Sequence, residues 1–231
     1  MIILVDYDNI EKAITRLGVG YLVNKIVSKI DPTEISHGRH ITIRLYGGWY
    51  EHTNFTTRAQ NISTDIALTF PNVAILSDNQ TTAIVNCEMA YSLIADPTNH
   101  LFHTFRTRGI PQGLKAHHPS SVGCSSANCP IISIYNFIKN DVCSQCSTIK
   151  PKDIFYRGEQ KLIDTMLTSD LIYSSNQSKN LCIVSSDDDL WPGIITTLIQ
   201  GKKVLHIYPK MHRMPYSYTR NAGNNYIQRN L

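Results

Sequence analysis

The chain has 231 residues, of which 42% are hydrophobic and 17% are charged. This composition supports a sizeable core and excludes a disordered or coiled-coil protein. No stretch approaches the roughly 20 apolar residues of a membrane span. No Lys or Arg precedes the first apolar run, Ile2 to Val5, and Asp6 ends that run early. We therefore expect no signal peptide and no membrane partner, and a soluble protein in the cytoplasm.

The charges are unevenly distributed along the chain. Two stretches contain no acid: residues 97–140, with four Lys or Arg, and residues 190–231, with six. In the rest of the chain the acidic residues outnumber the basic ones. This pattern favours a polyanionic partner held beside a carboxylate site. A chance fluctuation on a solvated surface is the alternative.

The first half of the chain alternates between strand and helix patterns. The apolar run Met1–Val5 predicts a buried parallel strand that delivers Asp6, Asp8 and Asn9 at its carboxyl end. The elements expected next are a helix from Asn9 broken at Gly18 and Gly20, a second helix to Ile30, a strand Ile41–Tyr46, a helix Phe55–Phe70, a strand Val73–Leu76, a helix Thr82–Ala95 and a strand Leu101–Phe105.

The second half continues this alternation after a cysteine-bearing insertion. The expected elements are a helix Gly158–Tyr173, a strand Leu181–Val184, a helix Leu190–Gln200 capped by Gly201 and a strand Val204–Tyr208. The pattern predicts an α/β fold, a three-layer sandwich with a mostly parallel central sheet. We expect one discontinuous domain of residues 1–108 and 153–210, an insertion of residues 109–152, and a loosely held polar tail of residues 211–231.

Four cysteines in the insertion follow a metal-binding pattern. Cys124, Cys129, Cys143 and Cys146 form C-x4-C, a gap of thirteen residues and C-x2-C. Two such knuckles can hold Zn²⁺ tetrahedrally, and four thiolates leave no open position, so the zinc would be structural. We expect Ile131–Tyr135 between the knuckles to be a strand, as in a zinc ribbon. Unrelated surface thiols are the alternative, and His117 or His118 could replace one thiolate.

Two of the predicted buried strands end in acidic clusters. Asp6 and Asp8 follow the first strand, and residues 187–189, all Asp, follow the strand Leu181–Val184. Ligand sites in parallel sheets form beyond the carboxyl ends of strands. Gathering these carboxylates is unfavourable without a divalent cation. An all-oxygen site suits Mg²⁺ or Mn²⁺, and hence phosphoryl transfer or phosphodiester hydrolysis.

Several motifs together resemble the NYN-domain family, a branch of the PIN-like ribonucleases. Ile3-Leu-Val-Asp6-Tyr-Asp-Asn9 resembles the family's opening motif. Lys161-Leu-Ile-Asp164 is similar to its Lys-x-x-Asp helix, and residues 184–189 are similar to its Ser-x-Asp-x-Asp-Phe motif, with Leu190 replacing the aromatic residue. The segment Arg106-Thr-Arg-Gly-Ile-Pro111 resembles the family's stretch before that helix. The match covers nearly the whole chain apart from the insertion and the tail.

The resemblance implies a metal-dependent endoribonuclease. The residues that it implies for catalysis are Asp6, Asn9, Asp164, Asp187 and Asp189, with Asp6, Asp164 and Asp187 as ligands of Mg²⁺ or Mn²⁺. The residues expected to contact RNA are Lys161, Ser185, Ser186, Arg106 and Arg108. The role of Asp8 stays open, as does a further acid from Asp65, Asp78 and Glu88.

An alternative is a catalytically inactive module of the same fold that binds nucleic acid or docks a partner. Inactive members of the family usually lose one of the Asp residues, whereas this chain has them all, which favours the enzyme. RNA is the expected partner, although the sequence does not separate RNA from DNA. A homo-oligomer or a protein partner stays open.

Overall fold

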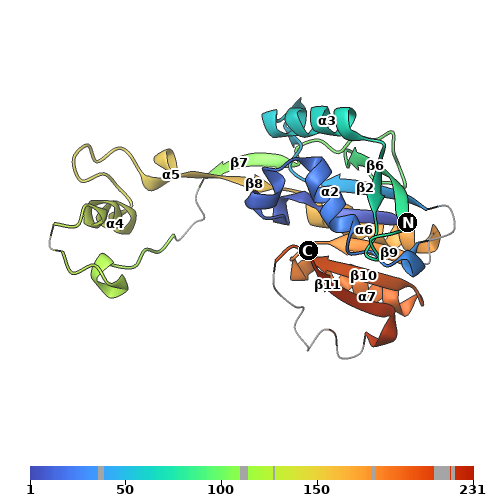
Figure 1. The fold of residues 1–231 in the computed structure, drawn as a ribbon. Coiled ribbons are helices and arrows are strands. Elements are labelled where there is room, and N and C mark those ends of the chain that lie inside the picture. Colours follow the sequence, from blue (N-terminus) through green and yellow to red (C-terminus); the bar gives the residue numbers. More distant parts are fainter. Residues whose placement is uncertain (36–38, 110–113, 127, 178–179, 211–218, 220–221) are drawn as a thin grey trace. The chain divides into compact units, whose positions relative to one another are not determined.

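The computed structural model describes residues 1–35, 39–109, 114–126, 128–177, 180–210, 219 and 222–231 (Figure 1). The chain divides into two compact units, which are described separately below. The first unit comprises Met1–Phe105 and Gln160–Leu231, and the second comprises Arg106–Glu159. None of the helices in these described ranges is long and apolar enough to cross a membrane.

The first unit is a mixed α/β structure around a seven-stranded sheet. The strand order is β11-β10-β9-β1-β2-β6-β5. Their bounds are β1 (Ile2–Asp6), β2 (His40–Tyr46), β5 (Asn72–Ile75), β6 (Thr82–Met89), β9 (Asn180–Val184), β10 (Lys203–Tyr208) and β11 (Tyr226–Asn230). Only β5 pairs antiparallel, with β6, and all other neighbours in this sheet are parallel. The predicted α/β fold with a mostly parallel central sheet is therefore confirmed.

The helices of this unit lie on both faces of the sheet (Figure 1). They are α1 (Lys12–Thr15), α2 (Val19–Val27), α3 (Thr57–Thr69), α6 (Ile163–Gln177) and α7 (Trp191–Ile199). Along β1, Ile3 and Val5 join a hydrophobic core with α2 and α3, whereas Leu4 joins a second core with α6 and α7. This arrangement is compatible with the expected three-layer sandwich. Because side chains alternate along a strand, Asp6 lies on the same face as Leu4, toward α6.

The predicted helix Thr82–Ala95 is wrong, because Thr82–Met89 is strand β6. Its side chains alternate strictly between exposed and buried, and Ala83, Val85 and Met89 belong to the core. Ile84 and Cys87 happen to fit a helical spacing, but Ile84 is 44% exposed. Pairing with both β2 and β5 fixes this segment as a strand.

Two further element predictions need correction. The helix expected over Gly158–Tyr173 begins only at Ile163, because Tyr156–Gln160 is strand β8. The strand expected over Leu101–Phe105 is instead β7 (Phe105–Gly109). In the first unit, β3 (Tyr50–Glu51) and β4 (Asn54–Phe55) pair antiparallel as a short hairpin, and Glu51 also pairs with Phe105.

The helices near the first acidic cluster are shorter than expected. A 3₁₀ turn (Tyr7–Asn9) follows β1, and α1 then begins at Lys12 instead of Asn9. Gly18 separates α1 from α2 with φ of 92°, a left-handed value that glycine adopts without strain. The helix α2 ends at Val27 and not at Ile30.

Among the described residues of the second unit are the helices α4 (Ile131–Asn140) and α5 (Pro151–Ile154). The strand expected over Ile131–Tyr135 is therefore wrong. No residue of α4 is buried, and neither hydrophobic core includes a residue of this unit. Residues 110–113 and 127 of the expected insertion lie outside the described residues.

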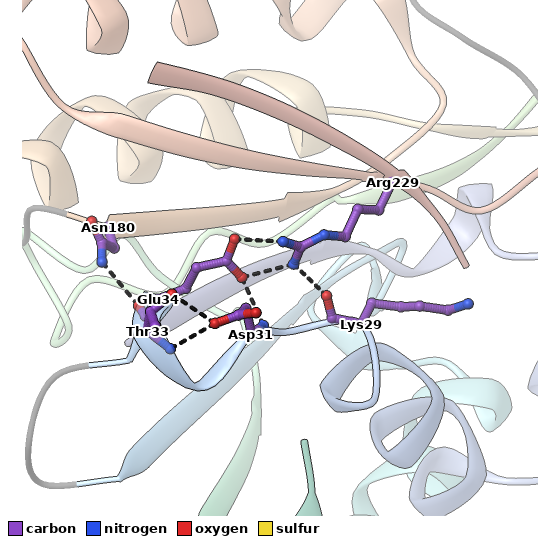
Figure 2. A network of polar contacts seen from close by, with 6 residues as sticks. All are labelled: Lys29, Asp31, Thr33, Glu34, Asn180 and Arg229. Carbon is purple, nitrogen blue, oxygen red and sulfur yellow. Dashed lines mark hydrogen bonds and ion pairs between the residues drawn. The ribbon is translucent and has the colours of Figure 1, made fainter. Parts of the chain in front are cut away.

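The end of the chain forms an edge strand, which differs from the loosely held tail that we expected. Residues 211–218 and 220–221 lie outside the described residues, but Tyr226–Asn230 pairs with β10 as β11. Figure 2 shows how Arg229 anchors this strand: its two terminal nitrogens each lie 2.7 Å from a carboxylate oxygen of Glu34. The carbonyl of Lys29 also accepts a hydrogen bond from Arg229.

Candidate active site

The carboxylate of Asp6 is the buried centre of the candidate site. Asp6 ends β1 and is 1% exposed. Its Oδ2 accepts hydrogen bonds from Asn9 Nδ2 and from Ser185 Oγ, the latter at 3.0 Å. Its Oδ1 has no hydrogen-bond partner among the described residues. Burial, together with smaller contributions from the charges of Asp164 and Asp8, raises the pKa of Asp6 to about 6 despite these hydrogen bonds.

The end of β9 supplies the neighbours of Asp6. Val5 of β1 pairs with Val184 of β9, so that Ser185 follows next to Asp6. The Oγ of Ser185 also accepts from the backbone N–H of Asp187 at 3.0 Å. The hydroxyl of Ser186 donates to Asn9 Oδ1 at 3.2 Å. Three residues predicted for the site, Asn9, Ser185 and Ser186, are thus brought together around Asp6.

Asp164 lies in the first turn of α6, the helix on the same face as Asp6. Partial burial raises its pKa, and the charges of Asp187 and Asp189 raise it further. Because Asp164 interacts electrostatically with Asp6 as well, it links the acids that follow β1 and β9. The four predicted carboxylates therefore occupy one edge of the sheet.

These carboxylates are neighbours without forming a closed coordination shell. In the ranges that the structure describes, no three Asp, Glu, His or Cys side chains are grouped closely enough to hold a metal ion. Asp187 Oδ1 instead accepts from the backbone N–H of Asp189 at 2.9 Å and caps the 3₁₀ turn Asp188–Leu190.

The donor chemistry fits a hard divalent cation. The unpartnered Oδ1 of Asp6 and the coupled carboxylates of Asp164 and Asp187 are oxygen donors, which Mg²⁺ and Mn²⁺ prefer. The pKa values of Asp6 and Asp164 are raised for the same two reasons, namely burial and unneutralised negative charge nearby. A cation would relieve this repulsion.

Asp8 and the other candidate acids have partners of their own. Asp8 forms an ion pair with Arg58 and accepts from the backbone N–H of Gly48 at 2.9 Å. The three middle-segment acids are also engaged: Asp65 accepts from the backbone N–H of Val19 at the start of α2, Asp78 accepts from Thr81 in a turn, and Glu88 pairs with Arg44. Nothing in the structure adds one of these three to the site.

The basic residues expected to contact RNA have a different setting. Arg106 and Arg108 both pair with Glu159 within the second unit, at 2.9 and 3.0 Å. The hydrogen bond from Arg106, followed by the charges of the neighbouring arginines, lowers the pKa of Glu159. Lys161 is exposed, and its backbone N–H donates to the carbonyl of Thr104. Because α6 begins at Ile163, Lys161 precedes the helix instead of lying one turn before Asp164 on it.

The cysteines of the second unit are all free thiols. Cys143 and Cys146 lie in one turn, in which the backbone N–H of Ser147 donates to the carbonyl of Cys143 at 3.0 Å. Hydrogen bonds from Thr148 lower the pKa of the Cys146 thiol to about 6, with smaller contributions from Ile149 and Cys143. This thiolate character suits a zinc ligand. Cys124 and Cys129 belong to the other knuckle, and the zinc site stays a prediction.

One residue at the site was not expected from the sequence. His206 of β10 is fully buried, and its Nε2 lies 3.1 Å from the carbonyl oxygen of Ser185. Because a carbonyl can only accept, Nε2 carries the proton and Nδ1 accepts from the Tyr226 hydroxyl at 3.0 Å. Burial lowers the pKa of His206 to about 4, so the imidazole is neutral at pH 7. A polar residue inside the apolar run Val204–Tyr208 was the signal available in the sequence.

Comparisons with protein-family models, with curated proteins and with solved structures found no match to this chain.

Proposed function

We propose that the first unit is a metal-dependent endoribonuclease of the NYN, PIN-like type. The observation that carries this proposal is the buried carboxylate of Asp6, whose Oδ1 has no partner among the described residues although Asn9 and Ser185 hold its Oδ2, at the edge where other acids follow β9 and begin α6. A carboxylate that is buried beside other acids lowers the stability of the fold, which a purely structural residue has no reason to do. Such a cluster is the expected feature of a site that a divalent cation completes.

Each residue of the cluster has a role in this proposal. Asp6, Asp164 and Asp187 would hold Mg²⁺ or Mn²⁺, which supplies an activated water and neutralises charge on the scissile phosphate. Asn9 and Ser185 hold the carboxylate of Asp6 in one orientation through its Oδ2, which leaves Oδ1 free. Asp189 lies close enough to Asp164 to add negative charge to the site.

His206 and Ser186 hold the two residues that contact Asp6. The neutral imidazole of His206 fixes the carbonyl of Ser185 without bringing a positive charge to the site. Ser186 orients the side-chain amide of Asn9, so that its nitrogen faces Asp6. These supporting hydrogen bonds resemble the outer shell that orients metal ligands in other proteins.

RNA is the proposed substrate because residues 190–231 include six Lys or Arg and no acidic residue, as suits a polyanion. Lys202, Lys203 and Lys210 in this stretch have no ion pair with any described residue and can contact phosphates. In the second unit, Glu159 neutralises part of the charge of Arg106 and Arg108. Zinc held by the four cysteines is proposed as the source of order in that unit.

An inactive binding module of the same fold is the second candidate. It is favoured by the lack, within the described ranges, of three metal-ligating side chains already gathered together. In that case the acids would persist as a charged edge, and RNA or a protein would bind without being cleaved.

Cleavage of labelled single-stranded RNA and DNA in Mn²⁺, Mg²⁺ or EDTA separates these candidates. The wild type should cleave RNA only with a divalent cation. Asp187→Asn should lose at least about 100-fold in rate, a typical cost of removing one group that stabilises the transition state. Asp188→Asn is the matched control, because Asp188 acts on Tyr208 and Tyr226 and not on Asp164. Equal rates for the two folded variants would remove Asp187 from the site.

A further inference from the structure

A second feature of the first unit is a cavity of about 370 Å³ between α1 and α3. Its lining begins at Tyr7, the residue that follows Asp6, and includes Asp8 and Ile10. One wall comes from the face of α1, and the other comes from residues of α3 that are three or four positions apart. Its volume lies within the range of about 300–1,000 Å³ that is typical of small-ligand sites.

Two cations of this cavity are free of ion pairs. Lys12 is the first residue of α1, and Arg16 directly follows the last one and keeps a helical conformation. Because they are four residues apart, their side chains lie on the same face, which lines the cavity. Both are exposed, and neither forms an ion pair with any residue that the structure describes. A cavity wall with two unneutralised cations attracts an anion.

The two acids in the lining are already engaged. Asp8 is paired with Arg58 of α3, and Asp65 accepts the backbone N–H of Val19 at 2.6 Å. The guanidinium of Arg58 lies over the ring of Tyr7, 5.8 Å from its centroid. The same guanidinium also lies over the buried ring of Trp49, 5.4 Å from its centroid. The cavity thus combines free positive charge with a guanidinium that two aromatic rings hold in place and that stays partly exposed.

We propose that this cavity binds a nucleotide of the RNA strand next to the one that is cleaved. Lys12 and Arg16 contact its phosphate, and the Arg58 guanidinium plane offers a stacking surface for its base. Tyr7 and Asp8, which line the cavity, directly follow Asp6 at the end of β1, so the cavity lies beside the proposed cleavage site. The assignment to an RNA strand rests on the proposed function. The preference for a phosphate group follows from the two free cations of the cavity.

Binding without cleavage tests this inference. A fluorescent single-stranded RNA is titrated in EDTA against the wild type, the double variant Lys12→Gln/Arg16→Gln and the control Lys25→Gln/Lys29→Gln. The control removes the same charge outside the cavity. The double variant should bind at least about tenfold more weakly, because two charged hydrogen bonds are lost. The slope of log affinity against log salt should fall by about 0.7 relative to the control, given about 0.7 for each phosphate neutralised on a single strand and one phosphate in the cavity.

Competition identifies the source of the phosphate. Adenosine monophosphate should displace RNA from the wild type more effectively than inorganic phosphate does. Equal RNA binding by the double variant and the control would overturn the inference. A double variant that loses adenosine monophosphate but retains RNA would also overturn it, since the cavity would then serve a free nucleotide.

The two proposals can fail separately. A protein that binds RNA through Lys12 and Arg16 but never cleaves it would contradict the proposed nuclease and support this inference. Cleavage of RNA with the same KM by the wild type and the double variant would support the proposed nuclease and contradict this inference. Unchanged thermal unfolding of the double variant, expected because both side chains are exposed, excludes misfolding as the cause of weak binding.

Discussion

The carboxylate edge of the first unit and the cysteine-bearing second unit obtain their order from different sources. Asp6 stands at the end of a strand whose residues Ile3, Leu4 and Val5 are fully buried in two cores. Helix α4 of the second unit has no buried residue, and Ile131 and Ile134 are at least half exposed. The sheet therefore holds the acids in place without a ligand, whereas α4 buries none of its side chains, and we expect a metal cross-link to supply the order of the second unit.

This difference shows where a metal would act on chemistry and where it would act on folding. At the end of β1, burial and, to a smaller extent, the charges of Asp164 and Asp8 raise the pKa of Asp6, so a cation would relieve an unfavourable charge that already exists. In the second unit, a cation would cross-link two cysteine pairs and supply the missing stability. Each half of this comparison can be tested separately.

The largest effect is expected from breaking the cysteine cluster. Cys143→Ser should abolish amide protection across Arg106–Glu159, while the first unit keeps its protection because it has its own core. Hydrogen exchange followed by mass spectrometry measures both units in one experiment. Cys87→Ser removes a cysteine that lies in the first unit, and serves as the control for zinc content.

The wild type should contain one zinc per chain, and Cys143→Ser should contain none. A wild type without zinc would contradict this half of the comparison. Unaltered protection of the second unit in Cys143→Ser would contradict it as well.

A second prediction concerns the strain at Asp6. Removing its charge by Asp6→Asn should raise the free energy of unfolding of the metal-free protein by roughly 3 kcal/mol at pH 7, as a pKa shift of about two units implies. The folded-state pKa of about 6 exceeds the unfolded value, so ionisation of Asp6 costs stability as pH rises from about 4 to 6. The difference between variant and wild type should therefore shrink as the pH falls through this window.

Urea unfolding in EDTA at pH 7.5 and at pH 5 measures this difference. Equal free energies of unfolding for Asp6→Asn and the wild type at both pH values would show that the charge of Asp6 does not destabilise the fold. A loss of stability in the variant at pH 7.5 would mean that its hydrogen bonds with Asn9 and Ser185 outweigh the cost of its charge.

A smaller effect is expected at the edge strand β11. Arg229→Gln should lower the free energy of unfolding by roughly 1–2 kcal/mol, between the values for exposed and buried ion pairs, because Arg229 and Glu34 are both partly buried. Exchange at Tyr226–Asn230 should accelerate first. Arg157→Gln in the second unit removes an exposed pair with Glu159 and should leave the first unit unchanged. Equal exchange at β11 in Arg229→Gln and the wild type would show that the ion pair does not hold this strand.

The strands that build the site could be predicted because their signal is local. Continuous apolar runs ending in acids identify β1 and β9 and place Asp6 and Asp187 at one edge. The errors arose where tertiary context decides. Thr82–Met89 fits a helical and a strand period equally well until its two neighbours are known. Ile131–Asn140 is rich in isoleucine, which favours strands, yet it forms α4.

Long-range contacts account for the remaining features that the sequence did not reveal. The polar segment Tyr226–Asn230 becomes a strand because Arg229 meets Glu34, 195 residues away. His206 belongs to the site because two neighbouring parallel strands place it beside Ser185. The partners of Asp8 and Asp65 are likewise distant in the chain. Residue spacing contains no signal for any of these pairs.

Binding of Mn²⁺ at pH 7.5, measured by calorimetry, tests the metal-dependent carboxylate site most directly. Wild type and Asp78→Asn should bind with the same affinity, because Asp78 belongs to a turn outside the site. Asp6→Asn should bind at least about tenfold more weakly, as for a lost metal contact. Affinity of the wild type should rise with pH through about 6, because a protonated Asp6 cannot coordinate. Equal Mn²⁺ affinity in Asp6→Asn, Asp78→Asn and the wild type would contradict the account.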